Sequence, residues 1–138
     1  MNDSTPLASL RVLVADDEPD SAESLALILK LWGCQVRTAP NGVNALEVAH
    51  AFVPDVVLMD LGMPVLDGWA AARQLRDEPG MREALFVAVT GFGLRGDRRR
   101  SQEVGFDYHL VKPIDPVALL DILTRALGLE PAAHVGES

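Results

Sequence analysis

The sequence predicts one α/β domain in which a five-stranded parallel sheet lies between two layers of helices. Short apolar runs alternate with segments of helical periodicity along the chain, which is the pattern of repeated βα units. Most of these runs are nearly continuous, as in strands that are covered on both faces. A closed barrel would need about 250 residues, whereas this chain has 138. The short connections therefore favour right-handed crossovers onto one open sheet, a doubly wound (βα)5 three-layer sandwich.

Five segments have the length and composition expected of strands. They are Val12–Ala15, Gln35–Thr38, Val56–Met59, Phe86–Val89 and Tyr108–Val111. Four of the five are nearly continuous apolar runs, so we expect all but the second to be buried on both faces.

A helix is expected after each strand. The first covers Asp20–Trp32 and ends before Gly33, a residue type that commonly terminates helices. The other four are Asn41–Ala51, Asp67–Asp77, Asp97–Val104 and Pro116–Leu127. Asn41 and Asp115 are suitable N-cap residues, because such side chains accept a hydrogen bond from the first helical turn.

Composition limits the class of protein. The chain is 49% hydrophobic and 23% charged, which suits a single globular domain. We place this domain at residues 10–128, between tails at 1–9 and 129–138. The formal net charge of −8 argues against direct binding to nucleic acid, which needs clustered positive charge.

The chain also lacks signals for export or membrane insertion. The only cysteine, Cys34, cannot form an internal disulfide and suits a reducing compartment. The first ten residues contain no basic segment followed by an apolar stretch, and no apolar run approaches the ~20 residues of a membrane span. We therefore expect a cytoplasmic protein that does not contact a membrane.

Polar side chains follow four of the expected strands, at the point where each strand ends. Asp16 and Asp17 follow the first strand, Asp60 the third, Thr90 the fourth and Lys112 the fifth. The carboxyl ends of parallel strands lie along one edge of a sheet, so these residues are expected to converge. Three crowded carboxylates repel one another, and a hard divalent cation relieves that repulsion. With a hydroxyl and an ammonium group beside them, they suggest metal-assisted phosphoryl transfer.

Each of these residues also has an ordinary structural explanation. Adjacent acids can complement the dipole at the start of a helix. A threonine at a strand end can simply favour β structure, and a lysine there can simply be solvated. The functional interpretation depends on their occurring together, each at a strand end.

Four short motifs carry a family resemblance. DDE at 16–18, MDLGMPVLDG at 59–68, VTG at 89–91 and VKP at 111–113 resemble the receiver domain of bacterial two-component response regulators. The resemblance extends from about residue 10 to residue 128 and implies the flavodoxin-like strand order 2-1-3-4-5. It implies that Asp60 is the phospho-accepting nucleophile, that Thr90 hydrogen-bonds the phosphoryl group and that Lys112 pairs with its oxygens. The implied ligands of Mg²⁺, or of Mn²⁺ in its place, are Asp16, Asp17, Asp60 and the backbone carbonyl of Gly62.

The resemblance further implies a switch. Thr90 would move toward the phosphoryl group, and an aromatic side chain three residues before the lysine would turn inward. His109 occupies that second position, so we expect Thr90 and His109 to form the switch. Gly62 and Phe92 stand where the family tunes dephosphorylation. Their lack of polar side chains favours a longer-lived phosphoryl group, and the alternative is that the bare glycine admits the attacking water.

Two surfaces are candidate interfaces. The fourth expected helix begins with Arg98, Arg99 and Arg100, which form either a solvated face or a docking surface for an acidic partner or a twin subunit. The last expected helix carries two apolar stripes, of which one must face the core. The stripe that we take as a candidate interface includes Leu119 and Ile122.

The resemblance implies a histidine kinase or a histidine phosphotransfer protein as phosphodonor and a protein as downstream target, with a homodimer as an alternative assembly. The domain would catalyse only its own phosphorylation and dephosphorylation. A stand-alone single-domain regulator is favoured. The alternatives are the C-terminal receiver of a hybrid histidine kinase and a degenerate receiver acting as a constitutive interaction module.

A flavin protein of this fold would need a Ser/Thr/Gly phosphate loop in place of the first acids. A phosphatase of the haloacid dehalogenase type would need a DxDx[TV] motif, which the sequence lacks.

Overall fold

The computed structural model describes residues 7, 10–61, 68–81, 83–91 and 105–126. Its centre is a five-stranded sheet with the order β2-β1-β3-β4-β5, and every pair of neighbouring strands is parallel. The strands are β1 (Arg11–Ala15), β2 (Gln35–Ala39), β3 (Val56–Asp60), β4 (Leu85–Thr90) and β5 (Tyr108–Val111). The predicted sheet and its strand order are confirmed.

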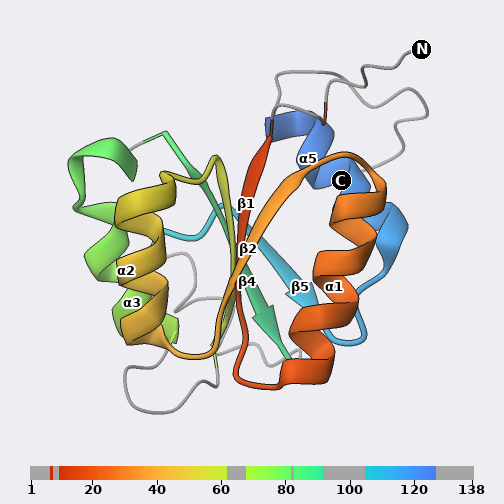
Figure 1. The fold of residues 1–138 in the computed structure, drawn as a ribbon, viewed down its shortest axis with the longest axis horizontal. Helices are drawn as coiled ribbons and strands as arrows, with labels where there is room; N and C mark the ends of the chain where they lie inside the picture. Colours follow the sequence, from red (N-terminus) through yellow and green to blue (C-terminus); the bar gives the residue numbers. More distant parts are fainter. Residues whose placement is uncertain (1–6, 8–9, 62–67, 82, 92–104, 127–138) are drawn as a thin grey trace.

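Helices cover both faces of the sheet (Figure 1). α1 (Pro19–Leu31) and α5 (Pro116–Ala126) lie on one side, and α2 (Gly42–Phe52) and α3 (Gly68–Arg76) lie on the other. A short 3-10 helix, η2 (Pro79–Met81), precedes β4. The helix expected over 97–104 and the tail expected over 129–138 lie outside the described residues. None of the helices in the described part of the chain has the length and apolarity of a membrane span.

The sheet separates two hydrophobic clusters, because successive side chains of a strand point to opposite faces. Leu13 of β1 belongs to the cluster that contains Leu75 of α3. Its neighbour Val14 belongs to the cluster that contains Leu29 of α1 and Leu123 of α5. Both faces of the central strands are therefore covered, as the continuous apolar runs predicted.

The edge strands are less buried than the central ones. Apart from the first residues of β1 and β4, all residues of β1, β3 and β4 are buried, whereas no residue of β5 is. The prediction that β5 is buried on both faces was wrong. The reason is its place at the edge of the sheet, where β4 is its only neighbouring strand.

Local signals fix the helix ends. The Asn41 side chain accepts a hydrogen bond from the Asn44 N–H at 2.8 Å, and Asp115 accepts one from the Val117 N–H at 2.9 Å. Both predicted N-caps are confirmed. α2 ends at Phe52, and the φ of 50° at its C-cap residue Val53 lies in the left-handed region. That region is unfavourable for a β-branched residue.

Two expected surface positions belong to the core instead. Leu119 and Ile122 are 0% and 6% exposed and pack in the cluster between the sheet and α1. They cannot form the predicted interface, because they are the residues of α5 that face the sheet. The exposed apolar residues of α5 are Val117 and Leu120. Leu7, expected in the N-terminal tail, is also buried in this cluster.

Candidate functional site

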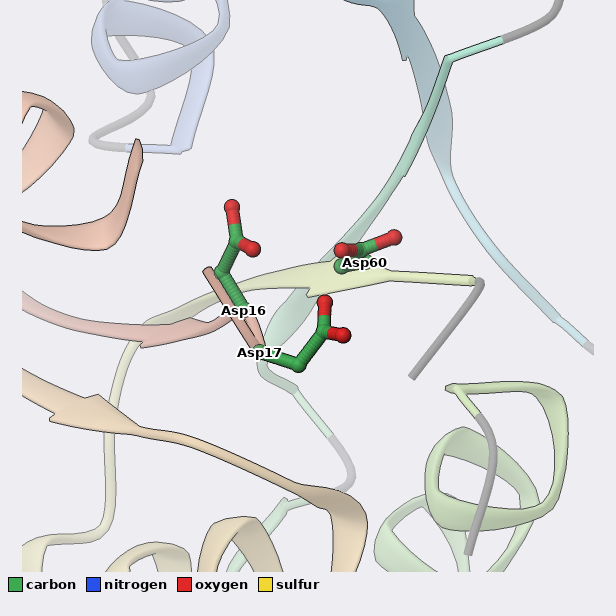
Figure 2. A group of neighbouring side chains, drawn as sticks. All are labelled: Asp16, Asp17 and Asp60. Carbon is green, nitrogen blue, oxygen red and sulfur yellow. The ribbon is translucent and has the colours of Figure 1, made fainter. Parts of the chain in front are cut away.

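Three carboxylates meet at the carboxyl edge of the sheet. Asp16 and Asp17 directly follow β1, and Asp60 is the last residue of the neighbouring strand β3. One carboxylate oxygen from each residue lies within 4.8 Å of the other two. Figure 2 shows the Asp17 carboxylate directed toward Asp60. The structure thus brings together the three acids that the sequence placed at strand ends.

The three acids differ in burial and in hydrogen bonding. Asp16 and Asp60 are buried, whereas Asp17 is exposed. Asp16 Oδ1 accepts a hydrogen bond from the Glu18 N–H at 2.9 Å, just before α1 begins. The Asp16 N–H in turn donates to the Ala39 carbonyl at 3.0 Å, which continues the pairing of β1 with β2. Asp16 is therefore held firmly by the backbone, and Asp17 faces the solvent.

Lys112 brings positive charge to the acids. Its Nζ lies 3.2 Å from Asp16 Oδ2 and 3.4 Å from Asp60 Oδ2. Burial alone would lower the pKa of Lys112, but the charges of Asp60 and Asp16 and their hydrogen bonds outweigh it, so the pKa is raised. The ammonium is thus kept charged beside the proposed nucleophile.

Glu18 also lies at this site, although the sequence analysis assigned it no separate role. Its Oε1 is 3.8 Å from Lys112 Nζ, and its side chain is 69% exposed. The only sequence signal for this contact is that Glu18 is the third acid of the DDE run. An ion pair so exposed contributes little stability.

Thr90 stands at the same edge, at the end of β4. It is buried, and its carbonyl accepts a hydrogen bond from the Lys112 N–H at 2.8 Å. In the sheet register Asp60 pairs with Val89, so Thr90 lies one residue further along its strand than Asp60. Among the described residues, no atom lies within 4 Å of a Cβ added at Gly91, so they leave the approach to this strand end open.

A mainly apolar groove opens beside Lys112, between α1 and the loop that leads into α5. Its volume is about 430 Å³. Besides Lys112 its lining includes Ser21, Ser24, Leu25, Ile28, Ile114 and Pro116. Lys112 thus belongs both to the lining of this groove and to the acid cluster.

The remaining predicted site residues are His109, which the structure describes, and five that lie outside the described residues. His109 lies in β5, pairs in register with Ala88 and is half-buried. Its strand neighbours Tyr108 and Leu110 pack toward α1 and α5, so alternation directs His109 to the other face of the sheet. The positions outside the described residues are Gly62, Phe92, Arg98, Arg99 and Arg100.

Comparisons with known proteins agree with this geometry. The chain matches the family model of the response regulator receiver domain over residues 12–124. It is 34% identical over 117 residues to Protein PilH of Pseudomonas aeruginosa. The aligned residues cover 85% of this chain and 97% of PilH. It is 39% identical over 111 residues to the response regulator PleD of Caulobacter vibrioides, which covers 80% of this chain but only 24% of PleD.

A solved structure adds a metal to the comparison. The receiver domain of the sensor histidine kinase PA1611 from Pseudomonas aeruginosa has a magnesium ion coordinated in its active site cleft. It is similar to this chain with a TM-score of 0.80 and 31% identity, covering 87% of this chain and 98% of that domain.

Proposed function

The chain belongs to the response regulator receiver family, and from this membership we propose that it accepts a phosphoryl group on Asp60 and then signals to a partner protein. The donor would be a histidine kinase or a histidine phosphotransfer protein. The observation that carries the proposal is the Lys112 ammonium, held between Asp16 and Asp60 at the edge of the acid cluster. A carboxylate nucleophile flanked by a fixed cation suits an incoming anion such as a phosphoryl group.

The acid cluster fits a magnesium ion, with Mn²⁺ as a substitute. Its ligand atoms are all carboxylate oxygens, the hard donors that Mg²⁺ prefers, and the exposed side of Asp17 leaves room for the waters that Mg²⁺ retains. The residues that would hold it are Asp16, Asp17 and Asp60, with the Gly62 carbonyl added from the family resemblance. When bound, the ion would offset the negative charge of the carboxylates and of the phosphoryl oxygens.

The residues of this chain would then act in one displacement. An oxygen of Asp60 attacks the phosphorus of a phosphohistidine, the new P–O bond forms as the P–N bond breaks, and the leaving imidazole takes a proton from solvent. Lys112 stabilises the charge that develops on the phosphoryl oxygens. The Thr90 hydroxyl donates a hydrogen bond to one of them and, with His109, transmits the change to the surface.

The groove beside Lys112 supports a protein donor. A donor that carries phosphohistidine must bring its imidazole to Asp60, and its neighbouring surface would then cover the apolar lining between α1 and the α5 loop. Burial of this lining would hold the donor in place during transfer.

We further propose a stand-alone single-domain regulator. The similarity to PilH over 97% of its length supports this assignment. A receiver within a hybrid histidine kinase is the second candidate, because the similar PA1611 domain belongs to a sensor histidine kinase.

Intact mass after incubation with acetyl phosphate tests the proposal directly. We expect one phosphoryl group on the wild type with Mg²⁺, none after chelation of the metal, and none on Asp60→Asn in either condition. A phosphoryl group on Asp60→Asn would place the acceptor elsewhere. If the mass of the wild type increases neither with acetyl phosphate nor with a cognate kinase, the protein would instead be an interaction module with a receiver fold.

A further inference from the structure

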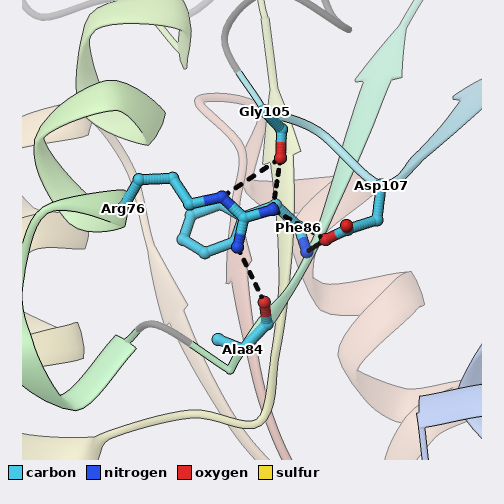
Figure 3. Close-up of polar contacts among 5 residues, drawn as sticks. All are labelled: Arg76, Ala84, Phe86, Gly105 and Asp107. Atoms are coloured by element: carbon cyan, nitrogen blue, oxygen red, sulfur yellow. Dashed lines mark hydrogen bonds and ion pairs between the residues drawn. The ribbon is translucent and has the colours of Figure 1, made fainter.

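The side chain of Arg76 bonds the residues that directly precede β5 (Figure 3). Arg76 is the last residue of α3, at the end of the sheet away from the acids. Its guanidinium donates from Nε to the Gly105 carbonyl at 3.1 Å and from Nη2 to the same oxygen. It also donates from Nη1 to the Ala84 carbonyl at 3.1 Å and from Nη2 to Asp107 Oδ2 at 3.0 Å. One side chain thus joins α3 to the residues that precede β4 and β5.

Asp107 extends this clamp into the sheet. The carboxylate oxygen that accepts from Arg76 also accepts from the Phe86 N–H at 2.8 Å, and the Asp107 N–H donates to the Phe86 carbonyl at 2.7 Å. The guanidinium carbon lies 4.4 Å from the centroid of the buried Phe86 ring. A Cβ at Gly105 would lie 3.1 Å from Arg76 Nε, so glycine is what allows the close approach.

The clamp matters because β5 is a short edge strand. It has four residues, and β4 is the one strand of the described sheet with which it pairs. Its start is fixed by Arg76 and Asp107, and its end by the hydrogen bond from the Lys112 N–H to the Thr90 carbonyl. Lys112 follows β5 directly, whereas its partners Asp16 and Asp60 belong to the central strands. A shift of β5 relative to β4 would therefore break contacts of 3.2 and 3.4 Å.

We propose that Arg76 is a positioning residue for phosphoryl transfer. By fixing Gly105 and Asp107 it sets the position of β5, and through β5 the position of the Lys112 ammonium beside Asp60. This inference rests on the proposed function, in which Lys112 stabilises the transferred group. It assigns a role in the reaction to a residue whose contacts all lie at the opposite end of the sheet.

Arg76→Lys is the informative variant. Lysine keeps the positive charge but has no planar fork, so it cannot bond Gly105, Ala84 and Asp107 together. Arg73→Lys is the matched control, because Arg73 lies about one turn earlier on α3 and is exposed. Thermal melts by circular dichroism would first identify a temperature at which every variant is fully folded.

The first readout is the rate constant of phosphorylation by acetyl phosphate with Mg²⁺, followed by intact mass. We expect Arg76→Lys to be slower by about fivefold or more and Arg73→Lys to match the wild type. We also expect Arg76→Lys to have no further effect in a Lys112→Ala background, because coupled residues are not additive. A wild-type rate for Arg76→Lys, or an equal slowing in both backgrounds, would overturn the inference.

The second readout is hydrogen exchange of the Lys112 amide, which requires no phosphoryl transfer. Arg76→Lys is expected to speed this exchange by about tenfold, since the Lys112 N–H loses its fixed partner when β5 shifts. Unchanged exchange of this amide in Arg76→Lys would overturn the inference. This holds even if Lys112→Ala is phosphorylated too slowly for the rate comparison in that background. A wild type that gains no phosphoryl group from acetyl phosphate or from a cognate kinase would refute the proposed function, and the exchange would still test the link from Arg76 to Lys112.

Discussion

Replacing Lys112 with methionine is expected to tighten Mg²⁺ binding and, at the same time, to slow phosphoryl transfer to Asp60. The Lys112 ammonium lies 3.2 Å from Asp16 Oδ2 and 3.4 Å from Asp60 Oδ2, beside the space that we propose holds the cation. Methionine keeps an unbranched apolar stem and removes the charge. The two effects have opposite signs because an ammonium repels a metal ion but attracts the oxygens of a phosphoryl group.

The size of the first effect follows from Coulomb's law. The three ligand oxygens lie within 4.8 Å of one another. A cation among them would be about 4 Å from the ammonium, where two unit charges repel by about 1 kcal/mol in water. The Lys112 side chain is 24% exposed, so water screens it incompletely and the value for water is a lower bound. The double charge of Mg²⁺ raises the repulsion to about 2 kcal/mol, or roughly thirtyfold in Kd. Since the lysine can swing aside, we expect a tightening of about fivefold to thirtyfold.

Isothermal titration of the metal-free protein with MgCl2 measures this change. Lys30→Met is the matched control, because Lys30 is the other lysine of the chain and is exposed on α1. Its Kd should equal that of the wild type. A Kd for Lys112→Met that is equal to or weaker than the wild-type value would refute the reasoning, since the ammonium would then not share the space of the cation.

Three further predictions concern the acids, the end of α2 and the buried thiol. Asp17→Ala is expected to weaken Mg²⁺ binding about tenfold without lowering the melting temperature of the metal-free protein, because Asp17 is exposed. Asp16→Ala is expected to lower both the Mg²⁺ affinity and the melting temperature, because Asp16 also accepts a hydrogen bond from the Glu18 N–H. Isothermal titration calorimetry and thermal melts measure these quantities for both variants. Val53→Asn is expected to raise the free energy of unfolding by about 1 kcal/mol in urea titrations, because asparagine tolerates the left-handed conformation better. Burial raises the pKa of the Cys34 thiol from 9.0 to about 11, so stability should fall as pH rises from 9 toward 11, where only the unfolded thiol ionises. Cys34→Ala should remove this loss in unfolding titrations across that range.

Each of these predictions has an outcome that contradicts it. Equal losses of melting temperature in Asp17→Ala and Asp16→Ala would mean that both acids support the fold. A less stable Val53→Asn would mean that the packing of this side chain, which is 39% exposed, outweighs its backbone strain. An undiminished alkaline loss in Cys34→Ala would assign the loss to other groups.

The place of the site was predictable because the sheet is parallel. Its central strands are continuous apolar runs, so their ends are visible in the sequence, and all of them point to one edge. The sequence alone therefore predicted that Asp16, Asp60 and Lys112 lie close together. The α/β order and the strand count followed from the same alternation.

Other features of the fold depend on contacts between elements, which the hydrophobic periodicity of the sequence does not indicate. The two apolar stripes of α5 are equally convincing in the sequence, yet the buried face takes Leu119 and Ile122 from one stripe and Leu123 from the other. The low burial of β5 follows from its place at the edge of the sheet, which the implied strand order contains but the apolar run of β5 itself does not indicate. Arg76 ends a helix and looks like a solvated cation, but it bonds residues 29 and 31 positions later.

The contacts of Lys112 have a consequence for how the protein becomes competent to respond. The ammonium meets Asp16 across 96 positions and Asp60 across 52. During synthesis the acids emerge from the ribosome before the lysine, so a nascent chain carries the proposed nucleophile without its cationic partner. A chain that is truncated before β5, or that has lost β5 by local unfolding, is in the same condition. If the proposed function holds, phosphorylation would therefore be fastest in a chain that is folded through β5.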